Sequence, residues 1–311
     1  MKVSVILVTW NVEGFIRQCL DSLRQQTFKD FEIIVVDNGS RDQTTSIVEK
    51  EYPEVLLVSN RENEGFCRAN NRGIRLSRGE YVLTLNADVV LDKGFLQCMV
   101  EAMEGGSQRM GMLSGKMLRQ DEITLDSAGL ILSKSRRFYD RGAEERDRGQ
   151  HDREREVFGV CAGAGFYRRA MLEDISTNGE YFDNHFFFLG EDFDISWRAQ
   201  LYGWKGEFLP SAVCYHLRGS SEHGSKFRQY LSFKNRYLLM LKNDSLVNIL
   251  LASPWLIPYD ACRFIYLIFT NRLVWRGIRE VFQALPDIWR KRRLIKAHTV
   301  VSNRYIREWL K

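Results

Sequence analysis

The first third of the chain alternates short apolar runs with segments in which apolar residues recur at helical spacing. The runs are VSVILVT (3–9), FEIIVVD (31–37), VLLVSN (55–60) and YVLTL (81–85). Short runs without polar alternation are typical of parallel strands that are covered on both faces. The segments between them carry apolar residues three and four positions apart, which indicates amphipathic helices. This alternation predicts an α/β fold around a Rossmann-like, mostly parallel sheet.

Beyond residue 110 the regular alternation of predicted strands and helices ends. Strand-like runs continue, but residues 136–156 hold 7 basic and 7 acidic side chains and almost no apolar ones. A segment of this polarity buries too little apolar surface to fold by itself. We therefore expect residues 136–156 to form a mobile loop, or a lid that becomes ordered when a ligand binds.

The basic charge of the chain is concentrated near its C-terminal end. The net charge is +5, whereas residues 263–311 carry 12 basic and 3 acidic side chains, which gives +9. Residues 246–274 are very apolar, but none of their uncharged runs reaches the ~18 residues of a membrane-spanning helix. The composition predicts basic amphipathic helices on an anionic membrane surface. The alternative is a helical subdomain packed on the body, or an oligomer contact.

Polar residues follow each of the four predicted strands. In chain order they are Thr9 and Asn11, Asp37, Asn63 with Gly65, and Asn86 with Asp88. Because the carboxyl ends of parallel strands meet at one edge of a sheet, these residues should lie close together. Ligands of open α/β sheets bind at that edge. The pattern therefore predicts a site for a polar ligand of the size of a nucleotide.

The common glycine-rich phosphate loops do not occur in this sequence. Gly163 and Gly165 lack the third glycine of a dinucleotide fingerprint, and Met117 stands where a P-loop needs serine or threonine. A bound diphosphate would therefore need a cation. Asp88 offers a hard oxygen ligand of the kind that Mg²⁺ and Mn²⁺ prefer.

Six segments together resemble family-two inverting glycosyltransferases of the GT-A fold. They are VSVILVTWN, VVDNGSRD, NEGFCRANNRG, LTLNADV, GAGFYRRAML and YFDNHFFFLGEDFDISWRAQLYGW. Within that family they look most like the bacterial rhamnosyltransferase-like members that build surface polysaccharides. The resemblance implies a GT-A (nucleotide-diphospho-sugar transferase) catalytic domain over residues 1–243, followed by a basic amphipathic helical extension over residues 244–311.

The resemblance also implies roles for single residues at the sheet edge. The residues that would contact the nucleotide sugar are Thr9, Asn11, Asp37, Asn63, Gly65, Asn86 and Asp88. The tripeptide Asn86-Ala87-Asp88 stands in the place of the family's Asp-x-Asp signature, so Asp88 would also bind Mg²⁺ or Mn²⁺.

Two further positions match the family downstream. Glu191-Asp192 corresponds to an acidic pair in which the aspartate is the general base. His216 resembles a histidine that completes the metal or diphosphate site in some members. Asp194, two residues further on, is expected to serve structure.

The implied reaction is metal-dependent, inverting sugar transfer. The donor would be a UDP- or dTDP-sugar, with rhamnose or another hexose, and the acceptor a hydroxyl of a lipid-linked or growing cell-surface polysaccharide. One carboxylate must take the proton of the attacking hydroxyl, and a metal neutralises the leaving diphosphate. Two alternatives stay open: a sugar nucleotidylyltransferase and a non-catalytic membrane adaptor.

The cellular location of the protein is inferred from its cysteines and its first ten residues. The six cysteines are scattered without a CxxC pair, and the first ten residues are too short an apolar run for a signal peptide. We expect a cytoplasmic protein that is peripheral on the cytoplasmic face of the membrane. Nucleic acid is not among the expected partners.

Overall fold

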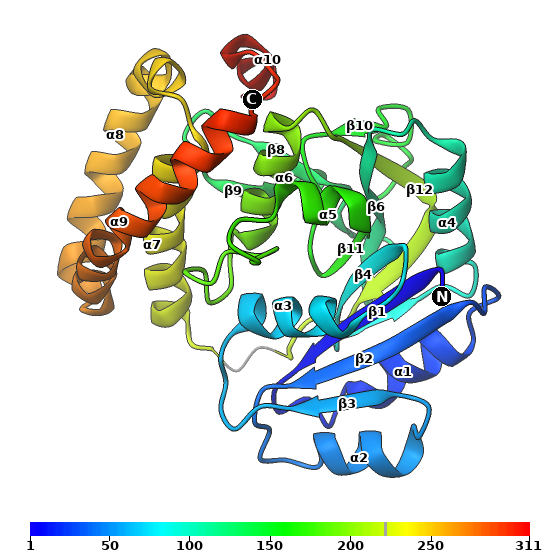
Figure 1. Ribbon diagram of the computed structural model, residues 1–311. Coiled ribbons are helices and arrows are strands. Elements are labelled where there is room, and N and C mark those ends of the chain that lie inside the picture. Colours follow the sequence, from blue (N-terminus) through cyan, green and yellow to red (C-terminus); the bar gives the residue numbers. More distant parts are fainter. Residues whose placement is uncertain (221–222) are drawn as a thin grey trace.

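The computed structural model describes residues 1–220 and 223–311, and it has a mixed α/β architecture (Figure 1). The strands are β1 (Val3–Thr9), β2 (Phe31–Asp37), β3 (Leu56–Ser59), β4 (Tyr81–Asn86), β5 (Val89–Leu91), β6 (Met110–Arg119), β7 (Leu125–Ser127), β8 (Leu130–Leu132), β9 (Phe138–Asp140), β10 (Glu156–Val157), β11 (Ala164–Arg168) and β12 (Lys205–His216). The helices are α1 (Ile16–Arg24), α2 (Thr44–Glu51), α3 (Phe66–Leu76), α4 (Phe95–Gly105), α5 (Arg169–Ile175), α6 (Glu191–Leu201), α7 (Ser225–Asn243), α8 (Leu246–Thr270), α9 (Leu273–His298) and α10 (Asn303–Glu308).

One large sheet forms the centre of the molecule. Its main path runs β10-β12-β6-β11-β4-β1-β2-β3, while β5 pairs with β12 and β7 with β6. β1 pairs in parallel with β2 and β4, β2 with β3, and β6 with β12, whereas β11 is antiparallel to both of its neighbours. β8 and β9 form a separate hairpin. The mostly parallel sheet that the sequence predicts is confirmed.

The register of the parallel strands brings their carboxyl ends to one edge. Thr9 pairs with Asp37 of β2, and Val8 pairs with Asn86 of β4. Asp37 in turn pairs with Ser59 of β3. The polar residues that follow these strands therefore start from neighbouring positions.

Helices cover both faces of this sheet because side chains alternate along each strand. Val5 and Leu7 of β1 pack in a core cluster with α1, α2 and α4. Ile6, which points to the other face, packs in a second cluster with α3, α5 and α6. Burial on both faces explains why the strands read as continuous apolar runs.

Residues 136–156 are mostly irregular, as expected for a loop, and their predicted mobility stays a prediction. The segment contains β9, and it is joined to the body by ion pairs with residues that are distant in the sequence. Arg136 is fully buried, with Nη2 2.8 Å from Asp244 Oδ2. Lys116 Nζ of β6 lies 2.8 Å from Asp147 Oδ2. Composition alone does not show these partners, and for that reason the segment looked unable to fold.

The last two helices pack on the body. Ile288 and Ile295 of α9 and Ile306 of α10 belong to the same core cluster as α3 and α6. Lys291 of α9 is buried, and its Nζ lies 2.8 Å from Asp183 Oδ1. The packed helical subdomain that the sequence left open as an alternative describes α9 and α10. The two-domain division of the chain stays a prediction.

α8 lies at the outside of the molecule and exposes many apolar side chains (Figure 1). It continues as one helix through Pro254 and Pro258. Its exposed large apolar residues are Leu246, Val247, Leu250, Leu251, Trp255, Ile257, Phe264, Ile265, Tyr266 and Phe269. Within residues 1–220 and 223–311, the helices are too short or too polar to cross a membrane.

Candidate functional site

A cavity of about 160 Å³ lies at the carboxyl edge of the parallel strands. Four of the predicted nucleotide-sugar residues line it, namely Thr9, Asn63, Gly65 and Asn86. They come from the ends of β1 and β4 and from the loop between β3 and α3. The aromatic residues Trp10, Phe66, Phe187, Phe188 and His223 complete much of the wall. The edge that the sequence marks as polar is therefore a lined cavity with both polar groups and aromatic faces.

Asp37 and Asn11 lie beside this cavity, outside its lining. The Asp37 carboxylate is buried and holds its own turn, because it accepts hydrogen bonds from Thr9 Oγ1 at 2.9 Å and from the backbone N–H groups of Gly39 and Ser40. Asn11 Oδ1 accepts from the Arg41 N–H at 2.9 Å. Both side chains shape the turn after β2, and their predicted contact with a nucleotide stays a prediction.

Gly65 allows two loops to meet at the cavity. Its φ of +87° favours glycine, and an added Cβ would lie 2.5 Å from Phe187 Cδ2. The Phe66 N–H donates to the Phe187 carbonyl at 2.7 Å, and Asn63 Oδ1 accepts from the Gly65 N–H at 2.9 Å. The loop before α3 is thereby joined to the loop before α6.

Asp88 is buried just beyond β4, beside the cavity wall. Its Oδ2 accepts a hydrogen bond of 2.7 Å from Ser220 Oγ. Its Oδ1 has no hydrogen-bond partner among the described residues and lies 3.2 Å from His216 Nε2 at ion-pair distance. Although burial raises the pKa of Asp88, His216 and Ser220 outweigh it and lower that pKa. Asp88 is therefore a buried, ionised carboxylate whose Oδ1 faces the His216 ring, and this oxygen could bind a cation that replaces the His216 proton.

His216, at the end of β12, lies between two carboxylates. Its Nδ1 is 2.7 Å from Asp126 Oδ2, while its Nε2 faces Asp88. The other oxygen of Asp126 lies 2.6 Å from Arg218 Nη2. Burial lowers the pKa of His216, but the two aspartates outweigh it and raise the pKa to about 9. Asp126 thus fixes the imidazole so that Nε2 points to Oδ1 of Asp88.

These residues fit a divalent cation. A carboxylate that holds one nitrogen of a histidine while the other nitrogen binds a metal is a common arrangement. Groups of three or more acidic, histidine or cysteine ligands do not occur among the residues described here. Asp88 and His216 would be the two protein ligands, which suits ions that take few carboxylates and complete their shell with phosphate oxygens and water. The raised pKa of His216 means that both ring nitrogens carry a proton near neutral pH, so a bound cation would have to displace the Nε2 proton.

The second predicted pair, Glu191 and Asp192, begins α6 after an unusual turn. Leu189 has φ +69° and Gly190 has φ +87°, so two consecutive residues are left-handed. A Cβ on Gly190 would lie 2.5 Å from Phe138 Cζ of the β8–β9 hairpin. The acidic pair is therefore held by backbone that only glycine at position 190 fits well.

No cation is recorded within ion-pair distance of either carboxylate among the described residues. Glu191 Oε2 is buried without a hydrogen-bond partner there, and Asp192 Oδ1 accepts only from the Phe193 N–H at 2.8 Å. Burial raises the pKa of Glu191 to about 7, and Asp194 adds to the shift. Burial, helped by Glu191 and Asp140, raises the pKa of Asp192 well above its usual range. The pair is therefore poised to bind a proton near neutral pH.

Two acids near this pair are engaged differently. Asp194 is buried and paired, with Oδ1 2.7 Å from Lys242 Nζ, as expected for a structural residue. Asp140 of β9 has a buried oxygen without a partner in the described part of the chain, and burial raises its pKa to about 6. Asp140 influences the pKa of Asp192 and is itself influenced by Asp126. Asp140 is therefore close enough to both the histidine cluster and the α6 pair to act on them electrostatically.

The sequence prediction missed Asp126, Asp140 and Ser220. Asp126 lies in the short strand β7, shortly before the charged segment, and Asp140 lies in β9, inside that segment. An aspartate inside the apolar run LDSAGLIL (125–132) was the available signal, because a carboxylate in such a run needs a partner.

Comparison with known proteins gives one family match and partial matches to named relatives. The model of the family described as "Glycosyl transferase family 2" matches residues 4–176. The chain is 36% identical over 101 residues to glycosyltransferase GlyA of Streptococcus pneumoniae, which is 32% of this chain and 14% of GlyA. It is 31% identical over 175 residues to a PGL/p-HBAD biosynthesis glycosyltransferase of Mycobacterium tuberculosis, 55% of this chain and 61% of that protein. The matches span less than two thirds of these relatives.

Solved structures are similar over nearly the whole chain. The S. aureus TarS fragment 1–349 in complex with UDP-GlcNAc matches with a TM-score of 0.58 at 20% identity, over 96% of this chain and 87% of that one. The mannosyltransferase PcManGT of Pyrobaculum calidifontis, in complex with GDP-Man and Mn²⁺, matches with a TM-score of 0.56 at 18% identity, over 96% and 85%. At these identities the likeness shows the fold, which is GT-A-like.

Proposed function

Because the chain belongs to glycosyl transferase family 2, we propose that it is an inverting transferase that moves a sugar from a nucleotide donor to a hydroxyl group. The donor is a UDP- or dTDP-sugar, and the acceptor is a lipid-linked or growing cell-surface polysaccharide. The neighbouring TarS fragment binds UDP-GlcNAc, which supports a nucleotide-sugar donor. The rhamnosyltransferase-like motifs favour rhamnose or another hexose as the sugar.

One observation carries this proposal: two short loops join the cavity lined by the predicted nucleotide-sugar residues, the candidate cation ligand Asp88 and the carboxylate pair of raised pKa. Phe187 lines the cavity and contacts Gly65, and the same loop continues through Gly190 into Asp192. Asp88 follows Asn86 and Ala87, which also line the cavity. A donor in the cavity would therefore place its diphosphate near Asp88.

Asp88 and His216 would hold Mg²⁺ or Mn²⁺. The Mn²⁺ in the structure of PcManGT supports a divalent ion in proteins of this fold. Bound there, the ion would neutralise charge on the leaving nucleoside diphosphate. Asp126 and Ser220 orient the two ligands from behind.

Asp192 would act as the general base. Inverting transfer is a displacement in which the acceptor hydroxyl attacks the anomeric carbon and loses its proton. A carboxylate with a raised pKa accepts that proton more readily than an ordinary, fully solvated one. Glu191 raises the pKa of Asp192 by its charge. We assign the proton transfer to Asp192, and to Glu191 the role of helping to raise the pKa of Asp192.

We also propose that α8 and α9 rest on an anionic membrane surface on the cytoplasmic side. α8 exposes the apolar residues given above, and α9 exposes Trp275, Phe282 and Trp289. The net charge of +9 over residues 263–311 adds electrostatic attraction to anionic lipid. A position at the membrane surface would bring the site close to lipid-linked acceptors.

A donor panel tests the proposed reaction. The protein is incubated with UDP-, dTDP- and GDP-sugars, with Mn²⁺, Mg²⁺ or a chelator, and with or without lipid-linked acceptors. Release of nucleoside diphosphate from one donor class, dependent on acceptor and metal, supports the proposal. Absence of both release and binding for every donor contradicts it.

A further inference from the structure

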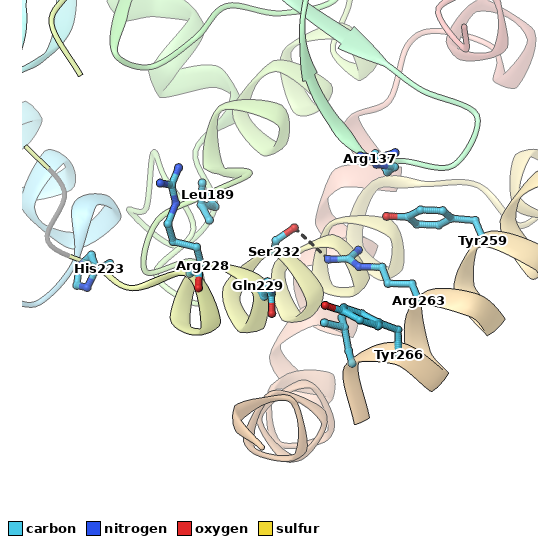
Figure 2. A pocket seen from close by; sticks show the side chains of 11 residues that line it. Arg137, Leu189, His223, Arg228, Gln229, Ser232, Tyr259, Arg263 and Tyr266 are labelled. Carbon is cyan, nitrogen blue, oxygen red and sulfur yellow. Dashed lines mark hydrogen bonds between the residues drawn. The ribbon is translucent and has the colours of Figure 1, made fainter. Parts of the chain in front are cut away.

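A second cavity, of about 670 Å³, opens between the β8–β9 hairpin, α7 and α8 (Figure 2). Figure 2 shows Arg137 reaching it from the turn of the hairpin, Arg228 from α7, and Arg263 from α8. Arg263 Nη2 donates to Ser232 Oγ at 3.0 Å. The remaining lining residues are Leu189, His223, Ser225, Gln229, Tyr259, Tyr266 and Leu267.

Among the residues that the structure describes, the lining of this cavity carries three guanidinium groups and no carboxylate. Within residues 1–220 and 223–311, Arg137, Arg228 and Arg263 form no ion pair, although Arg236 close by is paired with Asp260. Burial lowers the pKa of Arg263, as expected for a desolvated cation without a carboxylate partner. The excess of positive charge among these lining residues favours an anion over a cation as a ligand.

Two of the arginines lie over tyrosine rings at cation–π distance. The Arg137 guanidinium carbon lies 4.6 Å from the centre of the Tyr139 ring, and that of Arg263 lies 5.9 Å from the Tyr259 ring. A guanidinium held over a ring by its face can still donate through the N–H groups at its edge. Edges of this kind bind phosphate oxygens in pairs.

The arginine cavity adjoins both parts of the proposed reaction site. His223 lines this cavity and the donor cavity alike. Leu189 lines it too, and Asp192 follows three residues later in the chain. The arginine cavity therefore shares a wall residue with the donor cavity, and the segment that leads into the candidate base forms part of its lining.

The outer wall of the cavity is apolar and continues onto the exposed side of α8. Tyr266 and Leu267 belong to the lining, and Tyr266 is itself exposed. Ile265 and Phe269, on the same turns of α8, are exposed as well. An anionic group in the cavity would thus have an apolar surface beside it.

We propose that the arginine cavity binds the phosphate or diphosphate of a lipid acceptor and turns its acceptor hydroxyl toward Asp192. The inference rests on the proposed function, and it names the acceptor as a phosphorylated lipid. Arg137, Arg228 and Arg263 contact the phosphate oxygens. The lipid chain leaves over Tyr266 and the exposed face of α8.

The test measures binding of geranylgeranyl diphosphate to the full chain, by calorimetry below the critical micelle concentration. Geranylgeraniol, which lacks the phosphates, and inorganic pyrophosphate, which lacks the chain, are the two comparison probes. We expect the prenyl diphosphate to bind more tightly than either. Equal binding of the alcohol would overturn the anion site, and equal binding of pyrophosphate would overturn the lipid acceptor.

Arg137→Gln and Arg263→Gln should each weaken binding of the prenyl diphosphate about tenfold, because each removes a charge-assisted contact. Arg279→Gln, on α9 and outside the cavity lining, is the matched control and should bind as the unmodified chain does. Arg137 is exposed, so its replacement should leave the melting temperature unchanged. Unchanged binding in both cavity variants would overturn the proposal.

Donor binding separates this inference from the proposed function. UDP or dTDP should bind to Arg137→Gln and to the unmodified chain alike, because the donor cavity does not include Arg137. Donor binding without prenyl diphosphate binding overturns the acceptor site alone. Prenyl diphosphate binding without binding of any donor nucleotide supports the anion site and contradicts the proposed transferase function.

Discussion

His216 Nδ1 lies 2.7 Å from Asp126 Oδ2, and this contact turns the other ring nitrogen toward Asp88. The relationship joins β12 to β7, two strands that both pair with β6. It would present one carboxylate oxygen and one imidazole nitrogen to a divalent ion in fixed positions. The proposed dependence on metal therefore rests on a residue, Asp126, that would not itself touch the metal.

We predict that Asp126→Asn weakens Mn²⁺ binding about 10–100-fold, because residues that orient a metal ligand contribute at this level. Titration of Mn²⁺ by electron paramagnetic resonance, in the presence of UDP, measures the change. Asp121→Asn, at an exposed acid in the turn before β7, serves as the control. Equal Mn²⁺ affinity in Asp126→Asn and the unmodified chain would show that Asp126 does not orient His216 for metal binding.

Gly190→Ala should destabilise the fold and lower activity, because the added methyl meets Phe138 at 2.5 Å and the residue keeps a φ of +87°. Gly179→Ala is a matched control, since Gly179 has φ +76° with open space around it. Both changes cost about 1 kcal/mol for the left-handed backbone, and overpacking at Gly190 adds about 1–3 kcal/mol. Urea unfolding measures both variants. Equal losses would mean that the hairpin does not hold the α6 turn.

The Glu191–Asp192 pair predicts the pH dependence of activity. A base must be ionised, so kcat/KM should fall as the pH drops through the raised pKa values of the pair and reach a plateau above them. Glu191→Gln removes a charge that helps raise the pKa of Asp192, so the acidic limb should move to lower pH. The pH–rate profile is the measurement. If the acidic limb of the profile stays in place, Glu191 does not raise the pKa of Asp192.

Glu191→Gln should also change the free energy of unfolding, in a direction that follows from the raised pKa. Burial raises the pKa of Glu191 to about 7, so the folded state favours its protonated form. The folded chain therefore loses stability as the pH rises from the pKa of Glu191 in the unfolded chain to its pKa in the folded chain. Glu191→Gln should therefore be more stable than the unmodified chain at about pH 8, and the difference should vanish near about pH 4.

Phe269→Ser should reduce binding to vesicles that contain anionic lipid, because Phe269 is 83% exposed on α8. Co-sedimentation at low and high salt measures the effect, and high salt should weaken binding further. Leu56→Ser on β3 is the control, as Leu56 is 50% exposed and far from α8 in the sequence. Equal loss in both variants, or binding insensitive to salt, argues against the membrane surface on α8 and α9.

The sequence predicted the parallel sheet and its polar edge, because local patterns determine both. Thr9 and Asn86 end strands whose register follows from their apolar runs. The contact between Asp126 and His216 joins residues 90 positions apart, and no local pattern records it. The ion pairs of the charged segment could not be read from the sequence for the same reason, since Arg136 finds its partner, Asp244, 108 positions away. The arginine cavity likewise forms only when three separate elements meet.

Asp192→Asn tests the central claim of this account most directly. The amide keeps the shape of the side chain and cannot accept the proton of an acceptor hydroxyl. With the donor and acceptor that support turnover, we predict that the variant binds the donor nucleotide as the unmodified chain does. Its acceptor-dependent release of nucleoside diphosphate should fall by about 10²–10⁴-fold. Release at the unmodified rate, with donor binding intact, would contradict the assignment of Asp192 as the base.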